Sequence, residues 1–173
     1  MKKILAASLM VLALSLALKA QEHTGESWVT FKSEPGRFSI LLPEIPTDRT
    51  ETIQSEHGPY TTHLFVVKTA KSVFLLGWVD YDPSFNFSIP QELDANRDNF
   101  VKGLKATLLT TNNLTRDGYQ ALDFTAENAD STYISRVYMV GRRPYQLVAG
   151  TFKGKEDEAN VAKFFGSFKI DRH

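Results

Sequence analysis

Two aspartates and one arginine form the first group of residues whose types and spacing could do chemistry. Asp80 and Asp82 follow the apolar segment 73–79, and Arg97 falls on the apolar face of the next predicted helix. The two carboxylates are the natural partners of this arginine. The favoured interpretation is an ion pair that ties helix to sheet. In the functional alternative, Asp80, Tyr81, Asp82 and Arg97 line a ligand-binding cleft at the end of the sheet.

A second group lies in a predicted hairpin turn. Arg142 and Arg143 occupy the turn, and Tyr145 begins the strand that follows. Guanidinium groups beside an aromatic ring suit an acidic or carbohydrate partner. Paired arginines in a turn are more often simply solvated, so both interpretations stay open.

Other common chemistries lack their residues in this sequence. A metal site needs several converging ligands, and a Ser-His-Asp hydrolase needs an exposed serine on a strained turn. No G-x-S-x-G or G-x-G-x-x-G pattern occurs, and the chain has four histidines, two of them near its ends: His23, His57, His63 and His173. We therefore predict no metal, no cofactor and no catalytic residue.

The N-terminal residues have the pattern of a secretory signal peptide. Lys2 and Lys3 supply positive charge, residues 4–18 are apolar, and small Ala20 closes the predicted segment 1–20. The apolar run is shorter than the roughly 20 residues of a membrane-spanning helix, so we expect cleavage and no stable membrane insertion. Residues 21–27 are polar and are predicted to be disordered. The expected location is periplasmic or extracellular.

Composition after cleavage indicates one self-sufficient domain, residues 28–173. The chain has 20 basic and 20 acidic residues, and removing Lys2, Lys3 and Lys19 leaves 17 basic residues and a net charge near −3. This mild acidity argues against nucleic acid and anionic membrane partners. The chain has no cysteine, so its core alone must hold the fold, and about 150 residues bury enough surface for that.

The pattern beyond residue 28 predicts an α+β domain. Residues 73–79 are apolar on both parities, which indicates a central strand buried on both faces, whereas residues 47–55 are polar and predict an edge strand. Helices are expected from Ser88 to about Gly103, with Gln91 completing a capping box, and near residues 156–165. Further strands are expected at 28–32, 37–42, 60–68, 108–114, 119–128, 132–140 and 145–152.

Several phrases in order resemble the PsbP-like superfamily, and more closely its small secreted bacterial members. They are Trp-Val-Thr-Phe from 28, Gly-Arg-Phe-Ser-Ile-Leu-Leu-Pro from 36, Asp80-Tyr81, Arg97-Asp98, Val-Gly-Arg-Arg-Pro-Tyr-Gln-Leu from 140, and Lys-Phe-Phe-Gly-Ser-Phe-Lys-Ile from 163. The resemblance implies an α/β/α sandwich, a largely antiparallel sheet with helices packed on both faces. It also implies an accessory or binding role, and it transfers no catalytic residue.

The leading functional hypothesis is therefore a secreted or periplasmic, non-enzymatic accessory or binding protein. Its partner would be an unidentified protein or small molecule. Two alternatives stay open: a hydrolase-type enzyme using the carboxylates clustered near Arg97, and a structural component of the envelope.

Overall fold

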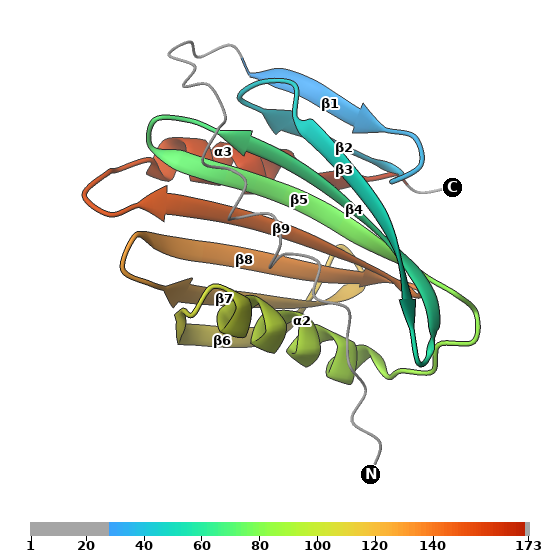
Figure 1. Cartoon of the computed structure of the whole chain (residues 1–173). Coiled ribbons are helices and arrows are strands. Elements are labelled where there is room, and N and C mark those ends of the chain that lie inside the picture. The colour runs from blue at the N-terminus through green and yellow to red at the C-terminus, as the bar shows by residue number, and fades with distance from the viewer. Residues whose placement is uncertain (1–27, 172–173) are drawn as a thin grey trace.

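A seven-stranded antiparallel sheet forms the body of the domain (Figure 1). The structure is a computed structural model that describes residues 28–171, so the predicted signal peptide 1–20 and the segment 21–27 lie outside the described residues. Across the sheet the strands run β3 (Thr47–Ser55), β4 (Gly58–Lys68), β5 (Ser72–Tyr81), β9 (Arg143–Phe152), β8 (Ser131–Val140), β7 (Tyr119–Glu127) and β6 (Thr107–Arg116).

The most deeply buried strand is β5, as its apolar sequence predicts. Its residues from Ser72 to Val79 are all buried, and side chains of alternate parity join different hydrophobic clusters. Phe74 and Trp78 belong to one cluster, and Val73 and Leu75 belong to the other. Since successive strand residues point to opposite faces, both faces of β5 are covered. The middle position of the sheet belongs to β9, with β5 beside it.

A separate small sheet packs on the first of these clusters. The predicted hairpin forms β1 (Val29–Ser33) and β2 (Phe38–Leu42), but it pairs with β10 (Lys169–Ile170) rather than with the large sheet. The alternate burial of β2 explains this arrangement, because Phe38, Ile40 and Leu42 are buried while the residues between them are not. Through those three side chains the small sheet packs face to face on the large sheet. A strand added to the edge of the large sheet could not make these contacts.

Both predicted helices are present. The first, α2 (Ile89–Gly103), begins at Ser88, whose side chain accepts a hydrogen bond from the Gln91 amide, and it contacts β7 and β8. The second, α3 (Glu158–Ser167), contacts β2 and β9 and contributes Phe164 to the Phe38 cluster. Its preceding residue, Asp157, accepts a hydrogen bond of 2.6 Å from Ser72 on β5. The architecture is thus mostly antiparallel sheet with two helices.

Strands β3 and β6 form the two edges of the large sheet. Edge strand β3 was predicted from its polarity, and it carries Asp48, Arg49 and Glu51, charges that discourage pairing with other chains. The opposite edge, β6, belongs to the meander β6–β7–β8–β9 that the turns predicted.

Phe38 joins the two sheets, and its loss should weaken the whole fold. The side chain is fully buried, and its ring lies 5.7 Å from the Trp78 ring and 5.7 Å from the Phe168 ring. Phe38→Ala should lower the free energy of unfolding by about 3–5 kcal/mol, measured by denaturant titration. Ile45→Ala is the control, because Ile45 is 80% exposed and should change stability by under about 0.5 kcal/mol. Equal losses in the two variants would contradict the proposed packing.

Candidate functional site

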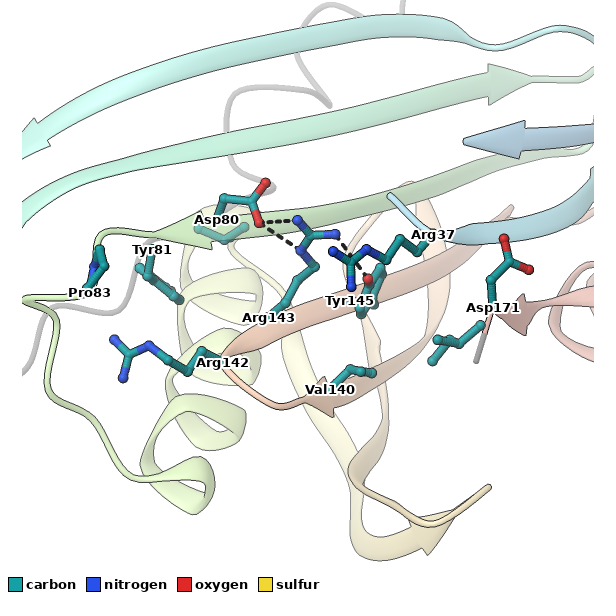
Figure 2. A pocket seen from close by; sticks show the side chains of 11 residues that line it. Arg37, Asp80, Tyr81, Pro83, Val140, Arg142, Arg143, Tyr145 and Asp171 are labelled. Atoms are coloured by element: carbon teal, nitrogen blue, oxygen red, sulfur yellow. Dashed lines mark hydrogen bonds and ion pairs between the residues drawn. The ribbon is translucent and has the colours of Figure 1, made fainter. Parts of the chain in front are cut away.

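A cavity of about 470 Å³ opens at the end of the large sheet (Figure 2). It lies where the end of β5 meets the β8–β9 turn, the β1–β2 turn and the residues after β10. Five of the residues predicted from the sequence line it together: Asp80, Tyr81, Arg142, Arg143 and Tyr145. The other lining residues are Arg37, Val79, Pro83, Val140, Ile170 and Asp171.

Arg143 holds the centre of this cavity. Its Nε and Nη2 donate to Oδ1 of Asp80 at 2.7 and 2.6 Å, and its Nη1 donates to the Pro35 carbonyl at 2.8 Å. Nη1 also lies 3.4 Å from the Tyr145 hydroxyl. Burial disfavours the guanidinium charge, but the contacts with Tyr145 and Asp80 outweigh burial and raise the pKa of Arg143. Arg143 therefore ties β5, β9 and the β1–β2 turn together and stays charged.

Asp80 is shared among three donors. Besides Arg143, the Trp78 indole N–H donates to its Oδ2 at 3.2 Å, and Nε2 of His63 lies 3.4 Å from the same oxygen. The His63 ring stacks on Trp78, with centroids 4.2 Å apart, and its Nδ1 lies 3.1 Å from the Thr50 hydroxyl. The carboxylate is thus a fixed structural anion between a guanidinium, an indole and an imidazole.

Tyr145 connects the floor of the cavity to the small sheet. Its hydroxyl donates to the Gly36 carbonyl at 2.8 Å, and burial raises the pKa of Tyr145 despite the opposing effect of Arg143. Position 36 requires glycine, because a Cβ there would lie 2.4 Å from the Phe38 ring and 2.8 Å from the Ser33 hydroxyl. This close approach brings the β1–β2 turn over Tyr145.

Two charged residues of the cavity were missed by the sequence analysis. Arg37 is exposed, has a left-handed φ of 52°, and donates its backbone N–H to the Glu34 carbonyl at 3.2 Å. Its carbonyl accepts from the Asp171 amide at 2.9 Å, so β2 and the segment after β10 place Arg37 and Asp171 side by side. The sequence segment that begins at residue 36 contains Arg37. The local sequence does not show, however, that the β1–β2 turn lies beside the end of β5 and the start of β9.

Arg142 is fixed rather than free at the tip of its hairpin. Its Nη2 donates to the Phe85 carbonyl at 2.5 Å and to the Asp82 carbonyl at 3.5 Å, and its guanidinium lies 5.1 Å from the Phe87 ring centroid. The Asp82 carboxylate turns back into its own loop, where it accepts from the Ser84 amide at 2.9 Å. Hydrogen bonds from Ser84 lower the pKa of Asp82. Asp82 thus contributes its backbone near the cavity, and its side chain does not line it.

The predicted ion pair of Arg97 with Asp80 or Asp82 is wrong. Arg97 pairs within its own helix, with Asp94 at 2.9 Å and Asp98 at 2.8 Å, and its Nη1 also lies 3.3 Å from the Thr111 hydroxyl on β6. The reason is strand parity. Asp80 shares the parity of Trp78, which packs with β2, whereas α2 packs in the cluster that contains Leu75. Arg97 therefore lies outside the cavity.

Tyr81 has a second role that the sequence did not suggest. Its hydroxyl donates to Oε1 of Glu92 at 2.5 Å, and the Asn96 amide donates to the same oxygen at 2.9 Å. Glu92 is 2% exposed, and this burial raises its pKa although both hydrogen bonds oppose the rise. In the sequence, Glu92 resembles an ordinary acidic residue of a first helical turn. The contact joins α2 to the β5 end of the cavity.

The chemistry of this arrangement suits binding. The cavity presents three guanidinium groups and an aromatic floor, and Asp80 is already held by Arg143. Within residues 28–171, no three His, Cys, Asp or Glu side chains gather as a metal site would require. The same residues contain no helix with the length and apolar character to span a bilayer.

Comparison with known proteins identifies the fold. No family model and no curated protein matches this chain. Its structure is similar to the solution structure of cyanobacterial PsbP (CyanoP) from Synechocystis sp. PCC 6803, with a TM-score of 0.55 and 11% sequence identity. The match covers 89% of this chain and 99% of that chain. The fold is therefore PsbP-like, as the sequence resemblance implied, and at this identity the likeness concerns the fold alone.

Protonation of His63 should destabilise the folded protein. Burial lowers the pKa of His63 below its ordinary 6.5, Arg143 acts in the same direction, and Asp80 and Asp48 oppose them. The unfolded chain thus binds this proton at a higher pH than the folded chain does. The stability from His63 is complete above about 6.5 and is lost as the pH falls toward the folded-state pKa.

The measurement is the free energy of unfolding from pH 7.5 to pH 5 for the natural chain and for His63→Phe, which keeps a ring on Trp78. The natural chain should lose more stability over this interval than the variant. Parallel curves would contradict the assignment.

Proposed function

We propose that this protein is an exported, non-enzymatic binding or accessory protein whose ligand occupies the cavity around Arg143. The observation that carries the proposal is the convergence of Arg37, Arg142 and Arg143 on one cavity with a Tyr145 floor. Its volume of about 470 Å³ lies within the range of small-molecule sites, roughly 300–1,000 Å³. The PsbP-like fold supplies the scaffold.

The layered scaffold in this proposal is a sandwich with helices on both faces of the large sheet. Its support is the separation of the hydrophobic clusters, one containing Phe164 of α3 and the other containing Phe100 of α2. Strand ends and turns then meet at one end of the sheet, where the cavity opens. Loops held by such a rigid sheet are common places for binding residues.

The hydrolase alternative has weaker support. A carboxylic general acid needs a raised pKa, whereas hydrogen bonds from Ser84 lower the pKa of Asp82. Asp80 accepts from Arg143 and Trp78, which leaves it engaged in structure. The buried Glu92 has a raised pKa, but its oxygen is held by Tyr81 and Asn96. These contacts favour binding over catalysis.

Export should leave a mature chain that begins at Gln21. The support is the order of charge, apolar run and small residues up to Ala20. Expression of the whole gene in a bacterial host, followed by intact-mass measurement of the periplasmic fraction, should give the mass of residues 21–173. A full-length chain retained in the membrane fraction would contradict export by cleavage.

Filling the cavity should abolish ligand binding without unfolding the domain. Val140 lines the cavity at the end of β8, whereas Ile134 lies on the same strand, 40% exposed and outside it. In a thermal-shift screen of small metabolites, compounds that raise the Tm of the mature protein should lose their effect on Val140→Trp and keep it on Ile134→Trp.

The same protein should show no turnover in a panel of ester, phosphoester and glycoside substrates. Turnover that disappears in Asp80→Asn would contradict the binding function and favour the hydrolase. Compounds that stabilise Val140→Trp as well as they stabilise the natural chain would show that the ligand binds elsewhere.

A further inference from the structure

The cavity carries two arginines whose donors remain available, and they lie on opposite sides of Arg143 (Figure 2). From this arrangement we infer that the ligand is a small organic acid with two carboxylate groups, one bound by Arg37 and the other by Arg142. The inference rests on the binding function proposed above and names the class of ligand.

Arg143 itself is occupied and cannot be the main anchor of the ligand. A guanidinium has five N–H donors. Arg143 directs donors to Asp80 from two nitrogens and shares the third nitrogen between Pro35 and Tyr145. Its positive charge is balanced by Asp80, and it lies between Arg37 and Arg142 (Figure 2).

Arg142 is prepared for an anion at one end. Its Nη2 is held by the Phe85 and Asp82 carbonyls and its plane lies over Phe87, while no described residue accepts a hydrogen bond from its Nε or Nη1. A guanidinium fixed in this way loses little conformational freedom when a carboxylate binds. Because Nη2, the terminal nitrogen beside Nε–H, is held by the two carbonyls, a carboxylate binds here through Nε–H or through the N–H groups of Nη1.

Arg37 offers the anion site at the other end. Its backbone is held on both sides, by the Glu34 carbonyl and the Asp171 amide. Within residues 28–171, its guanidinium makes no ion pair or side-chain hydrogen bond, and its charge acts to lower the pKa of Tyr145. The base of this side chain is thus fixed while its donors stay unused.

The charge of the cavity favours two separate carboxylates over a polyphosphate. Three arginines and two aspartates, Asp80 and Asp171, line the cavity, which leaves a net charge of +1. A group with two or more charges at one point requires several converging cations, whereas here the two available guanidiniums are separated. Single negative charges at two ends match this distribution.

The surface between the two arginines suits a short carbon chain. Val140 and Ile170, both partly exposed, supply apolar contact in the cavity. Binding sites typically combine such an apolar lining with a few placed polar groups. A linear diacid has the same order of features: carboxylate, methylene groups, carboxylate.

Isothermal titration calorimetry of the mature protein with linear diacids from succinate to pimelate tests the inference. One chain length should bind best, because the fold holds the Arg142 guanidinium and the backbone of Arg37. Arg37→Gln and Arg142→Gln should each weaken that binding at least tenfold. Arg49→Gln, which removes an exposed arginine on β3 outside the cavity, should leave it unchanged.

Four results would overturn the inference. The first is equal affinity for the neutral diamide of the best diacid, and the second is equal loss in all three arginine variants. The third is a tetraglutamate peptide that binds at least tenfold more tightly than any diacid, which would assign the carboxylates to a protein partner. Absence of binding by every diacid also overturns it. The proposed binding function is judged separately, by the loss of thermal shifts in Val140→Trp.

Discussion

The ion pair between Arg143 and Asp80 is the interaction on which the site depends. Asp80 is the penultimate residue of β5 and Arg143 is the first residue of β9, two strands that lie side by side in the sheet. From this pair, Arg143 reaches the Pro35 carbonyl, and the neighbouring Tyr145 reaches the Gly36 carbonyl. The contacts of Arg143 with Pro35 and of Tyr145 with Gly36 thus attach the small sheet to the end of the large one. Without the pair, Arg143 would no longer be held in place to donate to the Pro35 carbonyl of the turn that carries Arg37.

The pair also explains how a cavity lined by three arginines can exist in a chain with equal numbers of acidic and basic residues. Side-chain exposures of 24% for Arg143 and 42% for Asp80 leave both ions partly hydrated, so the cost of desolvation stays moderate. The central charge is neutralised by an internal carboxylate, and the proposed ligand would be bound by the flanking Arg37 and Arg142. In the proposed function, one arginine therefore supports the architecture and the other two bind the ligand.

The sequence predicted the scaffold well because strand and helix patterns are local. Two-sided burial of β5, the polar edge β3 and the Ser88 cap each depend on neighbouring residues, and all three are present. The small sheet was not predicted as a separate layer. Its pairing of β2 with β10 joins residues far apart in the chain, and no local pattern records such a partner.

The candidate site was predicted in part for the same reason. Asp80 and Arg143 were predicted as members of two separate groups, and the pairing of β5 with β9 brings these groups together. The prediction for Arg97 was wrong because helical periodicity shows which face of α2 is apolar. It does not show which face of β5 that helix covers. Arg37 was missed because its place depends on the docking of the small sheet. Glu92 was missed because its burial depends on the position of α2 over the sheet.

Side-chain NMR tests most directly whether Arg37 and Arg142 bind the ligand while Arg143 stays paired with Asp80. In a titration of the mature protein with its best diacid, the Nε–Hε signals of Arg37 and Arg142 should shift together, with one saturation curve. The signal of Arg143 should stay near its starting position, because its Nε remains bonded to Asp80. A large shift of Arg143 alone, with Arg37 and Arg142 unmoved, would contradict the account.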